Sequence, residues 1–422
     1  MASSADAPLP AADRRILRGL AARVREIAED PVMAERRRLW LLHNARRGER
    51  PMILAETWGA ADELVPVAAL QCADPWARGL ERGFLMTIFR FERVRDDSVV
   101  PPFLDYNWHV AIGDYGVQAV RQRGDSGGAM GSYRWDAPIK DLDRDFGRLH
   151  PRTVSADREA TVRARDRLHD VLGDILPPRL RGGFWWTMGL TWQAIDLIGL
   201  EGLMLAMCDK PAGLHRLMAF LRDDHLRVAE WLEREGLLTL NNEADYVGSG
   251  GMGYTRDLPQ PDHAPGAPAR LKDLWVLSES QETVGVSPAM FAEFVFPYQL
   301  PIVERFGLCY YGCCEPVHSR WDSLGRIPNL RTASVSPWCD QQVMAAALGD
   351  RVIFARKPNP ALVSRGRFPE DEIRADVRRT LDVARGCTIE FALKDVHTLA
   401  GDPTRPGRWC DIVREEIDAR RA

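Results

Sequence analysis

The second half of the chain alternates short apolar runs with segments of helical pattern, and this alternation restricts the fold more than any other feature. The apolar runs have the pattern of strands and cover residues 274–280, 308–312, 330–336, 351–356 and 387–393. The helices expected between and after them cover residues 287–307, 318–325, 340–349, 369–386 and 406–420. Alternating strands and helices are typical of a parallel sheet covered by helices, and this many units predict an α/β fold of the (β/α)8 TIM-barrel class.

An open, doubly wound sheet is the alternative arrangement of such units. It would normally carry a glycine-rich phosphate-binding turn after an early strand. The glycine-rich run at residues 124–133 follows no convincing strand, so the pattern favours the barrel.

The first half of the chain indicates where the barrel begins and where loops interrupt it. The segment before residue 49 is rich in Arg and Ala and carries apolar residues at helical spacing, whereas 50–59 has the pattern of a first strand. We therefore expect an N-terminal helical extension at 1–48 and a single barrel domain at 49–422, with loop insertions near 95–150 and 245–270. The first of these loops is expected to contain short strands.

Three further elements are expected between the two loops. Residues 156–175 and 210–236 have the pattern of helices, and 237–242 has the pattern of a strand. The most apolar window, 183–208, is long enough to span a bilayer, but it contains Asp196 and Glu201. Because charged side chains are costly inside a membrane, we expect a buried helix pair there.

The composition excludes several classes of protein. The formal net charge of −4 gives no basic surface for nucleic acid, and the first residues lack the apolar core of a signal peptide. The eight cysteines are scattered over the long chain without the spacing of a disulfide framework. We therefore expect a cytoplasmic protein without membrane or nucleic-acid partners, in which clustered thiols are candidates for metal binding or catalysis. The sequence leaves the oligomeric state open, a homodimer included.

Polar and titratable residues follow the expected strands, where a barrel would bring them to one face. They are Glu56, Asn241, Glu279, Cys313, Cys314, Glu315, Trp338, Lys357, Lys394, Asp395 and His397. A metal-assisted or acid–base site requires a collection of this kind.

Zinc in a catalytic site takes three protein ligands, and Cys314 or Cys313 could supply such a set together with His397 and Glu279. Adjacent side chains of an extended segment point to opposite faces, so we expect only one of the two thiols to bind the ion. The thiols could equally be small buried hydrophobes, and Cys313 or Cys314 could act as a nucleophile with His318. His397 could be a surface histidine, and the glutamates could be solvated loop acids.

Four stretches between residues 180 and 400 resemble the uroporphyrinogen decarboxylase superfamily of (β/α)8 barrels. They are "GGFWWTMGLTWQAIDLIGLEGLMLAMCDKPAGLHRLM", "SESQETVGVSPAMFAEFVFPYQLPIVERF", "YYGCCEPVHSRWDSL" and "DQQVMAAALGDRVIFARKPNPALV". True uroporphyrinogen decarboxylases carry an Arg- and Gly-rich substrate motif near the N-terminus. Here the corresponding region is "PMILAETWGAADELVP", which has an acid in place of the arginines, so the resemblance is greater to the zinc-dependent methyltransferase branch.

In that branch a His-x-Cys pair and a later cysteine hold zinc. Cys314 or Cys313 matches the motif cysteine, Gly312 or Tyr311 stands in place of the motif histidine, and the later cysteine falls near His397. The resemblance therefore implies a zinc-dependent methyltransferase with an altered ligand set, which Glu279 or Glu315 would complete. Zinc would act as a Lewis acid on the heteroatom of a small O- or N-methylated substrate. The methyl group would pass to cobalamin on a separate corrinoid protein, because no corrinoid-binding signature occurs in the chain.

We expect the remaining strand-end residues to divide into two groups. Catalysis is expected of Glu315, Asp395 and Lys394, and substrate binding is expected of Glu56, Asn241, Tyr311 and Trp338. Two other functions stay open. One is a metal-free decarboxylase or lyase of a small carboxylate, with Lys394, Lys357 or an arginine as the charge sink. The other is a barrel that binds a small ligand or a corrinoid protein without turnover.

Overall fold

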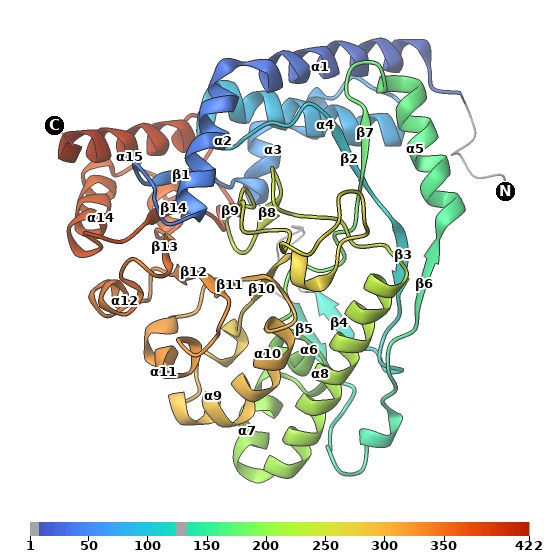
Figure 1. Ribbon diagram of the computed structural model, residues 1–422, viewed down its shortest axis with the longest axis vertical. Coiled ribbons are helices and arrows are strands. Elements are labelled where there is room, and N and C mark those ends of the chain that lie inside the picture. Colours follow the sequence, from blue (N-terminus) through green and yellow to red (C-terminus); the bar gives the residue numbers. More distant parts are fainter. Residues whose placement is uncertain (1–7, 124–132, 422) are drawn as a thin grey trace.

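A sheet of six parallel strands forms the centre of the computed structural model, which describes residues 8–123 and 133–421 (Figure 1). The strands of this sheet are β1 (Met52–Ala55), β10 (Trp275–Ser278), β11 (Leu308–Tyr311), β12 (Leu330–Val335), β13 (Ile353–Arg356) and β14 (Ile389–Leu393). Their order is β1-β14-β13-β12-β11-β10, and every neighbouring pair is parallel. The mixed α/β class and the parallel sheet predicted from the alternating pattern are confirmed.

Helices connect these strands in the order that the sequence predicts, apart from one additional short helix at Ala361–Ser364. They are α9 (Pro288–Phe294), α10 (Phe296–Val303), α11 (Trp321–Leu324), α12 (Gln341–Leu348), α13 (Ala361–Ser364), α14 (Glu370–Val383) and α15 (Arg405–Arg421). The one helix expected at 287–307 is two helices that meet at Val295. Pro297 lacks the backbone N–H that a continuous helix needs at this point, which explains the break, whereas Pro301 lies inside α10.

The N-terminal helices pack against the central sheet. They are α1 (Ala11–Glu29), α2 (Pro31–Asn44), α3 (Ala61–Leu64) and α4 (Pro75–Phe89). Leu17 of α1 and Trp40 of α2 are fully buried in one cluster with Met52 and Leu54 of β1. The apolar faces of the first two helices are therefore part of the core beside the first strand.

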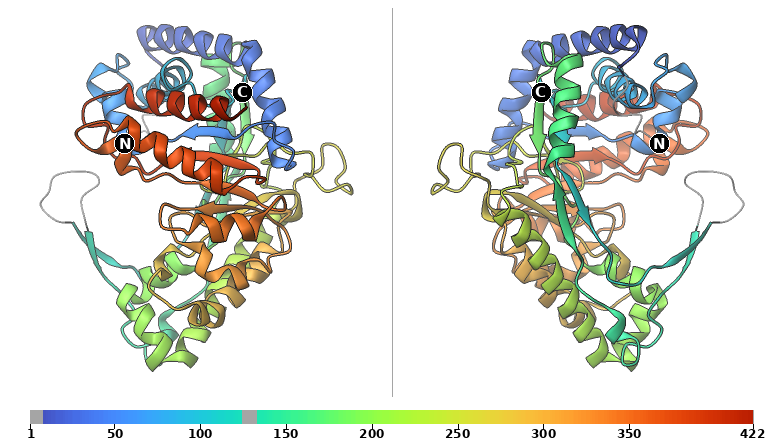
Figure 2. Two further views of the ribbon diagram at one scale, coloured as in Figure 1. Left: turned by 90° about the vertical axis from the view of Figure 1, so that its left-hand side faces the viewer. Right: turned by 90° about the vertical axis from the view of Figure 1, so that its right-hand side faces the viewer.

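Short strands occur in the expected loop region, as predicted. Those within 95–150 are β2 (Leu104–Asn107), β3 (His109–Ile112), β4 (Val120–Arg123) and β5 (Tyr133–Asp136), and two more short strands, β6 (Val154–Asp157) and β7 (Pro178–Arg181), lie beyond it. They pair as β2 with β7, β3 with β6 and β4 with β5, and Figure 2 shows the β4–β5 hairpin extending away from the body. Apart from Tyr133, the glycine-rich run 124–133 lies outside the described residues.

The helix α5 (Arg158–Leu172) lies between β6 and β7, and α6 (Thr191–Ile198), α7 (Leu200–Asp209) and α8 (Pro211–Arg234) follow β7. The apolar window 183–208 therefore contains the predicted helix pair, α6 and α7, and each has buried apolar side chains. Among the residues that the structure describes, no helix has the length and apolar character needed to cross a bilayer.

The strand expected at 237–242 is not formed, and this prediction was wrong. The segment is irregular, and the side chain of Asn241 does what a strand backbone would do. Its Oδ1 accepts from the backbone N–H of Trp275 (2.9 Å), and its Nδ2 donates to the Trp275 carbonyl (3.1 Å). The loop that follows contains the short strands β8 (Tyr246–Val247) and β9 (Gly251–Met252).

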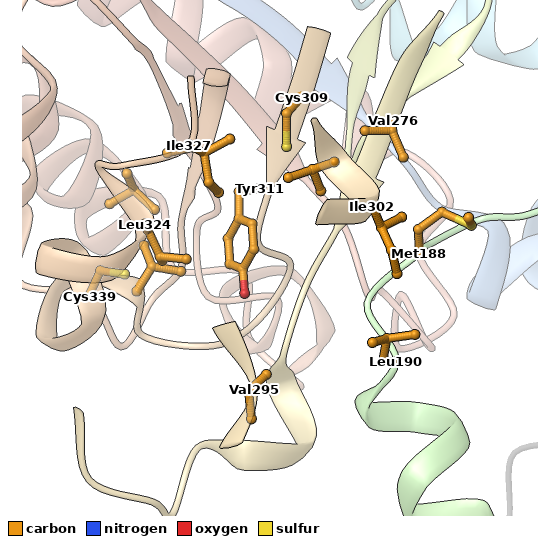
Figure 3. Packing of buried hydrophobic residues seen from close by; sticks show 14 of the residues in the cluster. Met188, Leu190, Val276, Val295, Ile302, Cys309, Tyr311, Leu324, Ile327 and Cys339 are labelled. Carbon is orange, nitrogen blue, oxygen red and sulfur yellow. The ribbon is translucent and has the colours of Figure 1, made fainter. Parts of the chain in front are cut away.

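The side chains of β11 alternate between two environments. Cys309 and Tyr311 face the helices, and Figure 3 shows them among apolar side chains that include Ile302 of α10. Tyr310 points to the opposite side, where it packs with Leu277 and Ala355. The hydroxyl of Tyr310 and the polar groups near it on that side are part of the candidate site.

Candidate functional site

The carboxyl ends of the six parallel strands meet at one edge, and most of the predicted site residues lie there. Glu56 follows β1, Glu279 follows β10, Cys313 follows β11, Lys357 follows β13 and Lys394 follows β14. All five side chains are buried. Ligands in parallel α/β folds bind at this edge, so its titratable groups form the candidate site.

A bend after β11 brings the two adjacent thiols together. Gly312 has φ +92°, a conformation that favours glycine, and an added Cβ would lie 3.1 Å from the Cβ of Ser334. Beyond this bend the Sγ atoms of Cys313 and Cys314 lie 3.4 Å apart. The expectation that they face opposite sides was wrong, because it assumed an extended chain where the backbone turns.

Cys313 has the surroundings of a thiolate. Its Sγ accepts from Ser249 Oγ (3.2 Å) and lies 3.7 Å from Lys394 Nζ, which itself donates to Ser249 Oγ (2.6 Å). The hydrogen bond from Cys314 and the charge of Lys394 lower the pKa of Cys313 to about 7, although burial opposes this shift. Cys313 is therefore substantially ionised near neutral pH.

Cys314 has the opposite character. Its single S–H has two acceptors within reach, Asp395 Oδ2 (3.0 Å) and the Sγ of Cys313 (3.4 Å), and the pKa of Cys314 is raised by its hydrogen bond to Cys313 and by burial. It is partly exposed and lines an open cavity of about 510 Å³ together with Trp338, whose exposed fraction is 67%. The structure thus brings together Cys313, Cys314, Lys394 and Asp395 from the predicted set.

Glu315 is fully buried, and its carboxylate binds backbone. Oε1 accepts from the N–H of Ser280 (2.9 Å), and Oε2 accepts from the N–H of Cys313 (2.8 Å). Burial raises the pKa of Glu315. Since each oxygen is already hydrogen-bonded, the geometry gives Glu315 a positioning role between the ends of β10 and β11.

Glu279 lies in a different wall of the site. Its Oε2 accepts from the N–H of Gln281 (3.0 Å), and it lines a cavity of about 460 Å³ with Trp185 and Glu282. Burial and the neighbouring carboxylates Glu282 and Glu315 raise the pKa of Glu279 well above its ordinary value. This environment therefore favours the protonated form of the Glu279 carboxyl.

Glu56 has the environment of a proton donor. Tyr246 donates from its hydroxyl to Glu56 Oε2 (3.0 Å), whereas the buried Oε1 has no hydrogen-bond partner. Burial raises the pKa of Glu56, and the charges of Lys394 and Lys357 oppose this shift. Glu56 lines a largely apolar cavity of about 710 Å³, together with Trp186 and Tyr246.

The predicted zinc ligands Cys313, Cys314, Glu279 and His397 do not gather around one point. His397 is exposed and packs against Gly59, where an added Cβ would lie 2.5 Å from Nδ1 of its ring. In the described part of the chain, no group of three or more His, Cys, Asp or Glu side chains could hold a metal ion. The donor set present therefore does not fit a zinc site with three protein ligands.

Two predicted substrate residues have structural partners. Tyr311 donates from its hydroxyl to Gln299 Oε1 (2.8 Å), and the same Oη lies 3.1 Å from Ser280 Oγ, which places the hydroxyl in the layer between sheet and helices. Asn241 binds the backbone of Trp275, as described above, although it also borders a small cavity of about 270 Å³.

Sequence reasoning missed Tyr246 and Ser249, which come from the loop near 245–270. Ser249 lies between Gly248 and Gly250, which both have positive φ. At Gly250 an added Cβ would lie 2.9 Å from Ala392 of β14, so the loop passes close to the sheet. The glycine-flanked serine was the available signal, and only the fold shows which sheet edge it reaches.

Scans against protein-family models and against curated proteins find no match to this chain.

Proposed function

We propose that the chain is a methyltransferase that moves a methyl group from a small O- or N-methylated substrate to a corrinoid protein. The observation that carries the proposal is the buried carboxyl of Glu56, with one unpartnered oxygen, in the wall of the 710 Å³ cavity. Such a cavity suits a small, largely apolar ligand. The methyl acceptor is proposed from the sequence resemblance alone.

Glu56 supplies the acid that this reaction needs. As the bond between the methyl carbon and the heteroatom breaks, its electron pair stays on the heteroatom. Glu56, whose protonated form is favoured because burial raises its pKa, gives its proton to that atom, while the methyl group passes to the acceptor. The glutamate left behind is stabilised by the charges of Lys394 and Lys357 and by the Tyr246 hydroxyl. Water returns the proton before the next turnover.

The proposal includes a (β/α)8 barrel of the uroporphyrinogen decarboxylase type. The pairing of β1 with β14 supports it, because the first and last strands of a closed barrel lie side by side. Beyond β10, the N–H of Met188 donates to the carbonyl of Leu277 (2.9 Å), so the chain before α6 continues along that edge of the sheet.

A methyl-transfer assay tests the role of Glu56. The purified chain is incubated with 3-methoxybenzoate or trimethylamine and reduced cobalamin, and the demethylated product is measured by mass spectrometry. We expect Glu56→Gln to lower the rate by about 10²–10⁴-fold, the usual worth of a general acid. Glu201→Gln, on the exposed surface of α7, is the matched control and should leave the rate unchanged. An active Glu56→Gln variant would remove the central argument.

Zinc dependence is a separate prediction from the resemblance. Although the described donors do not gather around one point, the resemblance implies about one zinc ion per chain, lost in Cys314→Ala and in His397→Ala, as measured by elemental analysis of the purified protein. Zinc at background in the wild type, with the rate unchanged in chelator, would contradict it. That result would not contradict the proposed role of Glu56 as the general acid.

A metal-free decarboxylase is the second candidate, and the buried lysines favour it. Lys357 donates to Tyr310 Oη (2.7 Å), and burial lowers the pKa of Lys357 to about 8. With Lys394 it could hold a substrate carboxylate at the same edge. Carbon dioxide release that persists in chelator and falls in Lys394→Met would support this function, whereas ligand binding without product would support a non-catalytic barrel.

A further inference from the structure

The strongest feature that the proposed function leaves unused is the pair of adjacent thiols after β11. The 3.4 Å between their Sγ atoms is ordinary contact for two unbonded sulfurs, so a small movement would bring them within bonding distance. Each thiol is also held from the far side. Ser249 donates to Cys313, and Asp395 accepts from Cys314, so the two sulfurs are positioned rather than free to rotate apart.

Oxidants can reach this pair from one side. Cys314 is partly exposed and borders the open cavity of about 510 Å³, next to Pro316 and Trp338. Cys313 is buried behind it, with an exposed fraction of 3%. A small, uncharged oxidant such as hydrogen peroxide therefore reaches the pair past Cys314, and the sulfur of Cys313 lies 3.4 Å behind that of Cys314.

We propose that Cys313 and Cys314 are an oxidative modification site, which hydrogen peroxide converts to a disulfide between adjacent residues. The sulfur of Cys313, the more readily ionised of the two, attacks one peroxide oxygen and becomes a sulfenic acid, and the other oxygen leaves as water. The sulfur of Cys314 then attacks the sulfenic sulfur, and a second water leaves. The two thiols lose two hydrogens and two electrons in total, and one peroxide is reduced to two waters.

This disulfide differs from a stable structural crosslink. Adjacent Cα atoms lie about 3.8 Å apart across a trans peptide, whereas disulfides usually join Cα atoms about 4.4–6.8 Å apart. The resulting strain makes the bond easy to reduce, so thiols should reverse the modification. Oxidation also removes the S–H that Cys314 donates to Asp395, and it changes the partner of Lys394 at the strand edge. The inference concerns thiol chemistry and does not depend on methyl transfer.

Peptide mapping of the full-length protein tests the proposal. The chain is dialysed against a chelator, so that no bound metal shields the thiols, then treated with hydrogen peroxide, alkylated and digested with trypsin. Cleavage after Arg305 and Arg320 releases residues 306–320, which contain Cys309, Cys313 and Cys314. We expect this peptide to be lighter by two hydrogens, with one alkyl group on Cys309 and none on the adjacent pair. Treatment with dithiothreitol before alkylation should restore all three alkyl groups.

Two variants define the site further. Cys314→Ser should leave Cys313 alkylated or over-oxidised and never disulfide-bonded, whereas Cys208→Ser, which removes an exposed thiol elsewhere, should not change the result. Alkylation of both Cys313 and Cys314 after peroxide would overturn the proposal, and so would a disulfide from either residue to another cysteine. The peptide map of the wild-type protein tests the proposal by itself, so the test does not depend on the folding of either variant.

Discussion

A neutral histidine lies inside the long helix α8, where burial removes its charge. The Nδ1 of His225 donates to the Leu221 carbonyl (2.8 Å), and its exposed fraction is 4%. Burial, with a contribution from Arg152, lowers the pKa of His225 to about 4 from an unfolded value of 6.5. Below pH 6.5 the unfolded chain binds a proton that the folded chain refuses, so stability falls as the pH falls towards 4.

The loss of unfolding free energy expected from His225 is large enough to measure. Between pH 8 and pH 5, His225 should lower the free energy of unfolding by about 2 kcal/mol. Urea denaturation at the two pH values, compared with His225→Asn, isolates this contribution from those of other groups. The control is His109→Asn, which changes an exposed histidine. Between pH 8 and pH 5 this variant should lose as much unfolding free energy as the wild type does. An equal loss in His225→Asn would show that the buried ring is not responsible.

At the residue scale the sequence predicts which side chains reach the strand edge better than it predicts where they point. Glu56, Cys313 and Lys394 lie at the edge because parallel strands end there together. Their orientations depend on local turns that composition does not show. Asp395, for example, has φ +56°, and the chain turns away there before His397.

Among the elements, β10 and β11 depend on one carboxylate beyond their ends. Glu315 accepts from Ser280 and from Cys313, and both N–H groups belong to buried residues. Glu315→Ala should leave these donors unsatisfied and lower the free energy of unfolding by about 2–5 kcal/mol. Glu304→Ala, at an exposed position after α10, should change it by less than about 0.5 kcal/mol. Chemical denaturation compares the two, and equal values would show that Glu315 does not join the strands.

The order of strands and helices after residue 270 follows from the sequence, because each element there is short and ends at a clear turn signal. The two errors have physical causes. At 237–242 the amide of Asn241 replaces backbone pairing, and at 287–307 Pro297 interrupts a pattern that is otherwise helical. Neither the Asn241 contact nor Pro297 changes the apolar periodicity, so the pattern alone could not reveal either irregularity.

For the whole molecule, the main question is whether the helices before residue 49 are separable from the rest. Trp40 of α2 is fully buried, and its Nε1 donates to the Asp97 carbonyl (2.8 Å). Its ring meets His43 edge-on at 5.2 Å, and the Nε2 of His43 contacts Glu390 of β14 (3.1 Å). These contacts join α2 to both ends of the chain, because β14 pairs with β1 in the sheet.

Trp40→Ala tests this arrangement. The variant should lose about 3–5 kcal/mol of unfolding free energy, since it leaves a cavity and an unpaired carbonyl in the shared core. Trp338→Ala removes the same side chain from a surface position with an exposed fraction of 67%, and should cost far less. Guanidinium unfolding followed by circular dichroism is the measurement, and the wild type should unfold in one transition. The contrary result is a separate early transition in the wild type, with Trp40→Ala shifting that transition alone. It would show that residues 1–48 are an extension that folds independently of the sheet.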